Sequence, residues 1–293
     1  MDGTFKTSPS IFGQVYTIHG FIGTKETGKV FPLVYSLMTN KSEELYRCFL
    51  KEIDTALGNR ERKTEVIITD FEKAAMNAVD KELNVDYGGC YFHLKKSFLK
   101  KANKFGFNKL IGTNMELQRL YKLMCALPFL PPNEIPSAFD ILVGSIGTDY
   151  QEAKDFIKYV ETYYIRGTAT RLYQVPPKFP PVFWSVYSRT ELGLPRTQNS
   201  VESWHNRLNI LVGTSHPNVF KLVEEFRKEE HSTTAEIIRQ ELSGGSQSKR
   251  RKDYLEKEAT LLSLFQERDS MPVLVYLEKV ARRLKLGLDL YQP

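Results

Sequence analysis

Three carboxylates occupy positions where strands and a helix are expected to end or begin. Asp2 lies in the first expected strand, Asp70 ends the strand-like run 65–69, and Glu202 lies in the first turn of an expected helix. Such carboxylates repel one another when they converge, unless a cation neutralises them. Mg²⁺ accepts a few carboxylates and keeps water or phosphate at its other positions, and two ions about 3.5–4 Å apart can clamp in-line attack at phosphorus. One interpretation is therefore a divalent-metal site on a rigid strand.

Each acid also has an ordinary structural explanation. Asp70 in "TDFEKA" has the form of a helix N-cap, and for this residue alone we expect capping first. Glu202 suits the first turn of a helix because of the helix dipole, and Asp2-Gly3 is a common turn pair. The spacing alone leaves these alternatives open.

Two further groups of ligand type accompany the acids. Cys90-x-x-His93 has the spacing of half a zinc site, but no second Cys or His pair stands nearby in the sequence. We therefore expect no zinc site, but a buried cysteine and a hydrogen-bonded histidine that support the strand. His205, one turn after Glu202, is placed to approach a metal or phosphate, and equally suits a packing or surface position.

Basic residues gather in two short runs. The chain has 41 basic and 35 acidic residues, a net charge of +6, which tolerates a polyanionic partner without proving one. Lys95, Lys96, Lys100 and Lys101 could follow phosphates, or form a solvated helix face. The run 248–253 holds Lys249, Arg250, Arg251 and Lys252, which suit a nuclear-import signal, a DNA contact or a solvated loop.

Composition limits the class of protein. The 293 residues are 41% hydrophobic, enough for one large domain or two ordinary ones. Cys48, Cys90 and Cys125 are too few and too scattered for a disulfide framework, which indicates a reducing compartment. No apolar run is long enough for a membrane span, and the first ten residues do not resemble a secretion signal.

The elements that must position the acids follow an α/β order. Strands are expected at 13–23 and 29–38 as a hairpin, with 1–7 as a third antiparallel member and Pro32 at an edge or bulge. A helix at 39–57 opens with an Asn40/Glu43 capping box and buries one face. That face is expected to hold Leu45, Cys48, Phe49 and Ile53. The strand that ends at Asp70, a helix at about 71–83 and a brief strand at 88–93 complete a mixed sheet.

The rest of the chain is predicted to be largely helical. Residues 94–195 are expected to form a helical insertion that contains a proline-rich loop at 173–197. The helix at 199–212 is expected to begin at an Asn199 or Ser200 cap and to bury Val201, Trp204, Leu208 and Leu211. We therefore predict a core of 1–93 with 196–212, an insertion of 94–195 and a helical carboxy-terminal region of 213–293.

Several motifs together resemble the transposase domain of Mutator-like elements (MULE), which are DDE recombinases with an RNase H-like fold. The resemblance runs in order along most of the chain and continues into the tail "LVGTSHPNVFKLVEEFRKEE". Its motifs are "MDGTFKTSP", "YTIHG", "FPLVYSLMTNKSEELY", "ITDFEKAAMNAV", "GCYFHLKKSF" and "RTQNSVESWHNRL". It implies that Asp2, Asp70 and Glu202 are the catalytic and metal-binding acids, and that Cys90 and His93 match the family's C-x-x-H motif.

The resemblance also implies an activity. The expected chemistry is cleavage of double-stranded DNA and transfer of a 3′-hydroxyl to a target phosphodiester, with two Mg²⁺ or Mn²⁺ ions, in the nucleus. A homo-oligomer is compatible with it, and no membrane partner is expected. The chain begins one residue before Asp2, where the family has apolar residues and a zinc-binding DNA-recognition module further upstream. This difference favours a truncated or domesticated copy, so the alternative is a catalytically inactive DNA-binding or transcription-regulatory protein.

Overall fold

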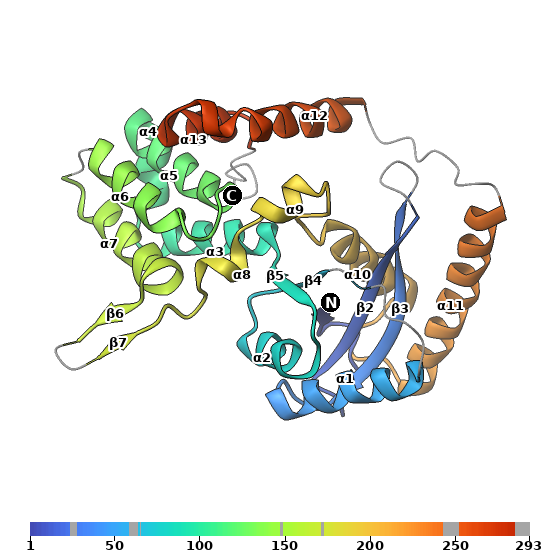
Figure 1. The fold of residues 1–293 in the computed structure, drawn as a ribbon. Helices are drawn as coiled ribbons and strands as arrows, with labels where there is room; N and C mark the ends of the chain where they lie inside the picture. Colours follow the sequence, from blue (N-terminus) through green and yellow to red (C-terminus); the bar gives the residue numbers. More distant parts are fainter. Residues whose placement is uncertain are drawn as a thin grey trace. The chain divides into compact units, whose positions relative to one another are not determined.

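The computed structural model describes residues 1–23, 28–58, 64, 66–146, 149–170, 173–242 and 252–284, with the backbone alone at 252–255 and 257. The chain divides into two units, each built from two segments (Figure 1). Unit 1 contains residues 1–87 and 197–249, and unit 2 contains residues 88–196 and 250–293.

Unit 1 begins with the predicted antiparallel meander. β1 (Asp2–Thr4), β2 (Gln14–Ile22) and β3 (Lys29–Met38) lie in that order, and Asp2 is opposite Thr17. The register shifts between Ile18 and His19, where Pro32 lies on the facing strand, and β3 is the outer strand of this sheet. The hairpin, the third strand and the bulged edge position of Pro32 are therefore confirmed.

The next helix begins later than predicted. α1 spans Glu43–Leu57, and its N-cap is Ser42, whose hydroxyl accepts a hydrogen bond from the Leu45 amide. Asn40 instead accepts a hydrogen bond from the Ser42 amide, so the predicted capping box is wrong. Leu45 and Phe49 pack against the core as predicted, together with the buried Tyr46 and Leu50, whereas Cys48 is exposed.

Asp70 does not cap the helix that follows it. β4 (Val66–Thr69) pairs with β5 (Asp86–Gly89), and α2 (Lys73–Glu82) lies between them in sequence. The N-cap position of α2 is Glu72 rather than Asp70, and the Glu72 side chain makes no capping hydrogen bond. The capping explanation of Asp70 is therefore wrong. The strand predicted for 88–93 ends at Gly89, and its last three residues belong to a helix.

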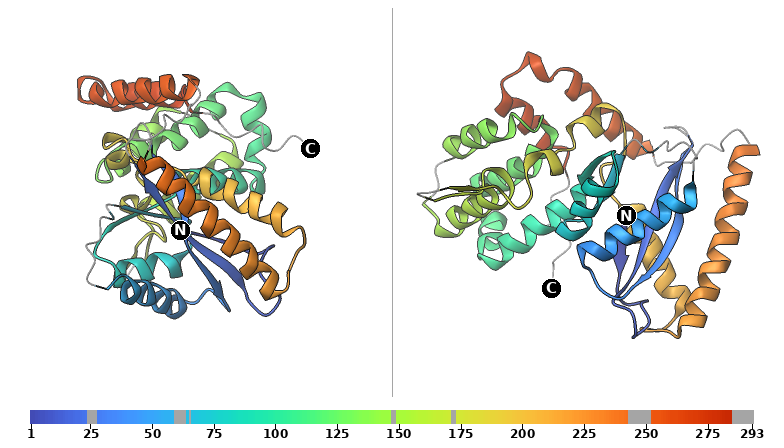
Figure 2. Two further views of the ribbon diagram at one scale, coloured as in Figure 1. Left: turned by 90° about the vertical axis from the view of Figure 1, so that its right-hand side faces the viewer. Right: turned by 60° about the horizontal axis from the view of Figure 1, so that its bottom comes forward.

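Helices cover both faces of the unit 1 strands (Figure 2). On one face, Tyr16 and Met38 pack with α1 and α2, including the small residues Ala75 and Ala78. On the other face, Val15 packs with Trp204 of α10 (Asn199–Val212) and Phe226 of α11 (Val219–Leu242). The alternation predicted for β2 is thus confirmed.

The helix predicted for 199–212 has the predicted bounds but a different cap and a slightly different buried face. The N-cap position is Gln198, whose side chain does not cap, so the predicted Asn199 or Ser200 cap is wrong. Leu211 is 51% exposed and Val212 is buried in its place, because the buried stripe continues four residues on from Leu208.

Unit 2 is mostly helical. Its larger helices are α3 (Tyr91–Lys104), α4 (Phe107–Thr113), α5 (Met115–Ala126), α6 (Ile135–Ser145), α7 (Gln151–Val160), α12 (Lys252–Gln266) and α13 (Val273–Ala281). The segment predicted as a proline-rich loop also contains regular structure. It carries β7 (Gln174–Val175), which pairs with β6 (Thr168–Ala169), and two short helices, α8 (Pro181–Trp184) and α9 (Tyr187–Glu191). None of the described helices combines the length and apolar character that a membrane span requires.

Candidate active site

Asp2 is held inside β1 rather than in a turn. Its side chain is almost fully covered, with 7% of the residue exposed, and Oδ1 accepts a hydrogen bond from the Gly3 amide at 2.8 Å. A Cβ atom at Gly3 would lie only 2.4 Å from Oε1 of Gln14, which is itself fully buried. The Asp-Gly pair therefore serves a close approach between strands, and the turn explanation of Asp2 is wrong.

The strand before Asp70 lies beside the start of β1 (Figure 1). The Met1 nitrogen donates a hydrogen bond to the carbonyl oxygen of Ile68 at 2.8 Å. Met1 immediately precedes Asp2, and Ile68 lies two residues before Asp70, so the structure brings these two strand segments together. Burial raises the pKa of Tyr16, which neighbouring Tyr46 and the negative charges of Asp70 and Asp2 raise further. Asp2 and Asp70 therefore both raise the pKa of the same buried side chain, Tyr16.

Gln198 joins the start of α10 to both strands. Its side-chain Nε2 donates hydrogen bonds to the carbonyl oxygens of Met1 at 2.9 Å and Ile68 at 2.7 Å. The backbone carbonyl oxygen of Gln198 accepts a hydrogen bond from the backbone amide of Glu202 at 3.1 Å. Gln198 is 4% exposed, so these bonds are shielded from water. One residue therefore ties the helix turn that carries Glu202 to the backbone next to Asp2 and before Asp70.

Two histidines, the buried His205 and the partly buried His19, share one hydroxyl near Asp2. His205, 7% exposed, has Nδ1 3.6 Å from Oδ2 of Asp2 and Nε2 3.3 Å from the hydroxyl of Thr17. The same hydroxyl is 3.1 Å from Nε2 of His19. Thr17 stands opposite Asp2 in the sheet, so the register of β1 and β2 puts Asp2 within reach of this network.

Burial favours the neutral form of both imidazoles. Desolvation lowers the pKa of His19 to about 3, with smaller contributions from the charge at the amino terminus and from His205. Desolvation also lowers the pKa of His205, against the opposing charges of Asp2 and Glu202. Asp2 and Glu202 therefore both act on His205, which supports their proximity at this end of the sheet.

The donor types suit a hard divalent ion, since carboxylate oxygens are the ligands that Mg²⁺ and Mn²⁺ prefer. However, among the residues that the structure describes, no group of three or more His, Cys, Asp or Glu side chains lies close enough together to hold a metal ion. The backbone segments that carry Asp2, Asp70 and Glu202 are joined, while binding by all three acids requires a side-chain arrangement other than the one described.

The C-x-x-H pair lies in unit 2, at the start of α3. Cys90 is fully buried at the N-cap position of this helix, and its backbone carbonyl accepts the Leu94 amide. His93 lies in the first turn, with its ring 5.6 Å from the ring of Phe92. Buried Arg189 donates to the neighbouring Gly89 carbonyl at 2.9 Å and so fixes the chain before Cys90.

The four lysines predicted on α3 differ in their surroundings. Lys96 and Lys100 are exposed, whereas Lys95 and Lys101 are partly buried. The Lys95 ammonium lies 5.2 Å from the ring centre of Tyr91, and that of Lys101 lies 4.8 Å from the ring centre of Tyr159. Of the second basic run, Lys249, Arg250 and Arg251 lie outside the described residues, as does the side chain of Lys252.

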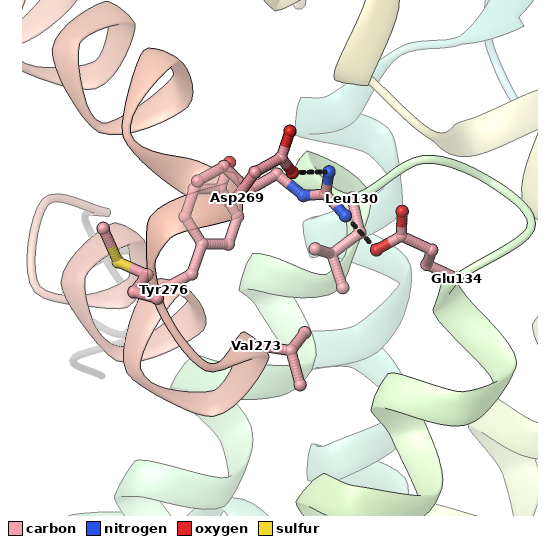
Figure 3. Close-up of a pocket in the computed structure, with 7 residues that line it drawn as sticks. Leu130, Glu134, Asp269, Val273 and Tyr276 are labelled. Carbon is pink, nitrogen blue, oxygen red and sulfur yellow. Dashed lines mark hydrogen bonds and ion pairs between the residues drawn. The ribbon is translucent and has the colours of Figure 1, made fainter.

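Unit 2 also has a cavity of about 240 Å³ that contains none of the predicted site residues (Figure 3). Arg268 reaches Glu134 on one side and Asp269 at 2.9 Å on the other, and Tyr276 forms part of the wall. The two carboxylates already neutralise the guanidinium, so we assign no ligand to this cavity.

Sequence reasoning missed Gln198 and did not single out Thr17 and His19. A glutamine before a helix has no distinctive pattern, because its partners are two backbone carbonyls far away in sequence. Thr17 and His19 did carry a signal. They share one face of β2, and the strand opposite them begins with Asp2.

Comparison with known proteins supports one family. Residues 1–97 match the family model of the MULE transposase domain, so the resemblance is confirmed over this part of the chain. The match includes Asp2, Asp70, Cys90 and His93, and ends before Glu202. No curated protein and no solved structure matches the chain.

Proposed function

We propose that unit 1, which begins with a MULE transposase domain, is the catalytic core of a DDE transposase that cuts and joins DNA strands. The match of residues 1–97 carries this proposal, since it includes two of the three acids. The third, Glu202, comes from the helix that Gln198 fastens to the strands of the first two.

The order of elements in unit 1 supports an RNase H-like arrangement. Three antiparallel strands are followed by α1, by β4 next to the start of β1, and by α2 and β5. The chain then leaves unit 1 and returns with α10, which covers the face opposite α1 and α2. In this arrangement, strands from separate parts of the chain bring Asp2 and Asp70 to one region.

Asp2, Asp70 and Glu202 would hold two Mg²⁺ or Mn²⁺ ions, which neutralise charge on the phosphate and favour ionisation of a bound water or hydroxyl. The Asp2 carboxylate is held in place, because Gly3 donates to one of its oxygens and His205 lies beside the other. The side chains of Asp70 and Glu202 would turn towards it.

Cleavage and joining are the same displacement at phosphorus. In cleavage, a water oxygen bonds to phosphorus, the bond from phosphorus to the 3′-oxygen breaks, and that oxygen takes up a proton. In joining, the freed 3′-hydroxyl loses its proton as its oxygen bonds to phosphorus in the target strand, and the target 3′-oxygen leaves and is protonated. One site therefore serves both steps. DNA as substrate also favours a nuclear location; a homo-oligomer stays a prediction.

A plasmid-nicking assay tests the proposal. Supercoiled DNA is incubated with the full chain in Mg²⁺ or Mn²⁺, and the nicked form is measured over time. We expect metal-dependent nicking that Asp70→Asn reduces by at least a hundredfold, because this change removes a ligand charge but keeps the side-chain shape. Asp149→Asn, the same change at an exposed residue, is the matched control and should nick at the wild-type rate.

Equal nicking by wild type and Asp70→Asn would exclude the catalytic assignment. DNA binding without nicking in any of the three proteins would instead favour the alternative, a transposase-derived DNA-binding protein without catalysis.

A further inference from the structure

The start of unit 2 concentrates the positive charge of the chain. Between Asp86 and Glu116 the sequence has six lysines and no acidic residue, a local charge of +6. The whole chain has 41 basic and 35 acidic residues, and 41 − 35 is also +6. The net charge of this one stretch therefore equals the net charge of the whole chain. Most of its lysines lie on α3.

Three of these lysines form one exposed line on α3. Lys96, Lys100 and Lys104 are all exposed and four residues apart, so they lie on the same side of the helix. With a rise of about 1.5 Å per residue, the line extends for about 12 Å. We call these three residues the lysine ridge. Lys95 and Lys101 lie at its flanks and pack over tyrosine rings.

The lysine ridge has no charge partner among the described residues. Other exposed lysines do have partners: Lys51 pairs with Glu82 at 3.7 Å, and Lys228 with Glu225 at 2.8 Å. Like charges four residues apart destabilise a helix. The ridge therefore weakens the isolated helix, and a bound polyanion would relieve the repulsion.

We propose that the lysine ridge binds the sugar–phosphate backbone of double-stranded DNA. The inference rests on the proposed function, since it gives the substrate of unit 1 a contact in unit 2. Lysine ammoniums act as point charges towards phosphate and read no base sequence, so the contact would be independent of sequence.

The surroundings of the ridge favour duplex DNA over other polyanions. The apolar residues of α3, such as Leu94, Phe98 and Leu99, are buried inside the unit. Among the described residues, α3 has no large hydrophobic side chain that is exposed. A helix that lies on a membrane needs such residues to enter the lipid, and a single-strand surface needs aromatic rings for base stacking.

Salt-dependent binding tests the proposal. Binding of a fluorescent DNA duplex to the full chain is followed by anisotropy in EDTA at several salt concentrations. Each phosphate contact contributes about 0.9 to the slope of log K against log salt, so three contacts contribute about 2.7. We expect Lys96→Gln/Lys100→Gln/Lys104→Gln to reduce the slope by that amount, while circular dichroism shows an unchanged fold.

The matched control is Lys51→Gln/Lys81→Gln/Lys228→Gln. It removes three exposed lysines from unit 1 and lowers the net charge equally, but these lysines are ion-paired. It should keep the wild-type slope. The ridge proposal fails if the ridge variant keeps the wild-type slope, if the control loses as much, or if vesicles of anionic lipid bind more tightly than the duplex.

This experiment is independent of catalysis, because EDTA prevents metal-dependent cleavage. If the ridge variant shows the reduced salt dependence and the wild type does not nick the plasmid, the DNA contact of the lysine ridge is supported and the catalytic proposal is rejected. If the wild type nicks the plasmid with metal and the ridge variant keeps the wild-type salt dependence, the catalytic proposal is supported and the lysine-ridge proposal is rejected.

Discussion

The side-chain amide of Gln198 donates a hydrogen bond to the carbonyl oxygen of Ile68 at 2.7 Å, across 130 residues of chain. The same nitrogen also binds the Met1 carbonyl, so a single donor group spans two strands. The three candidate acids lie one to four residues from these contacts. The geometry of the site therefore depends on a residue that has no charge and is itself not a ligand.

Replacement of Gln198 by Glu should destabilise unit 1. Glu keeps the shape, but its carboxylate cannot donate. The Met1 carbonyl then loses this donor, the Ile68 carbonyl keeps only the Met1 nitrogen, and both carbonyls face a negative charge. We expect a loss of about 2–4 kcal/mol in the free energy of unfolding, measured by urea denaturation. Gln118→Glu is the control, since Gln118 accepts a hydrogen bond from Lys122 and a carboxylate does so equally well. Similar stabilities of the two variants would contradict the role of Gln198.

Replacement of Gly3 by Ala should also destabilise the protein. The new methyl group would meet Oε1 of Gln14 at 2.4 Å, and Gln14 cannot easily move because its amide donates to Tyr46 at 2.7 Å. Overpacking of this kind costs about 1–3 kcal/mol.

Gly144→Ala provides a control with the opposite sign for Gly3→Ala. No atom lies within 4 Å of a Cβ at Gly144, which is helical, so alanine should stabilise by up to about 1 kcal/mol. Thermal unfolding should rank Gly144→Ala above wild type and Gly3→Ala below it. A Gly3→Ala protein as stable as wild type would mean that β1 does not approach Gln14 so closely.

Replacement of Glu229 by Ala should weaken the packing of α10 on α11. The Glu229 carboxylate is 6% exposed, accepts the Trp204 indole N–H at 2.9 Å and pairs with Arg207. Arg207 is about half exposed, so most of the loss comes from the buried indole, and we expect about 1–3 kcal/mol. Glu224→Ala removes a 68% exposed carboxylate from the same helix and should change the stability by less than about 0.5 kcal/mol. Equal losses in urea denaturation would argue against the buried contact.

Acidification should destabilise the protein through His19. The imidazole has a pKa of about 3 in the folded protein and 6.5 as its ordinary value. Between these pH values the unfolded chain binds more protons, so the free energy of unfolding falls as the pH drops. From pH 7 to pH 5 the His19 contribution is about 2 kcal/mol. His19→Gln should lose this part of the pH dependence, while His231→Gln, at an exposed histidine of α11, should keep it. The idea fails if both variants follow the wild-type pH dependence.

Periodicity in the sequence predicted most of unit 1. The alternation in β2 is a local signal, and β2 and β3 both lie where expected. The same holds for the bounds of α10. Helix caps were less predictable, because Ser42 and Asn40 are both good capping residues and only the backbone path decides between them.

The candidate site was predictable in part. Asp2, Asp70 and His205 were singled out by their types and positions, and His205 does lie beside Asp2. The link through Gln198 was not, since a buried amide between two main-chain carbonyls depends on pairing that the local sequence does not specify. The short helices α8 and α9 were also missed. Pro181, which starts α8, equally suits a loop, and each helix is only one turn long.

The division of each unit between two segments of chain has a consequence for biosynthesis. As the polypeptide leaves the ribosome, the strands of unit 1 emerge first, but α10 and α11, which cover one face of them, follow only after the whole segment 88–196. Until then the buried face of β2 and β3 stays exposed to the cytosol. A nascent chain in that state is a natural client for chaperones.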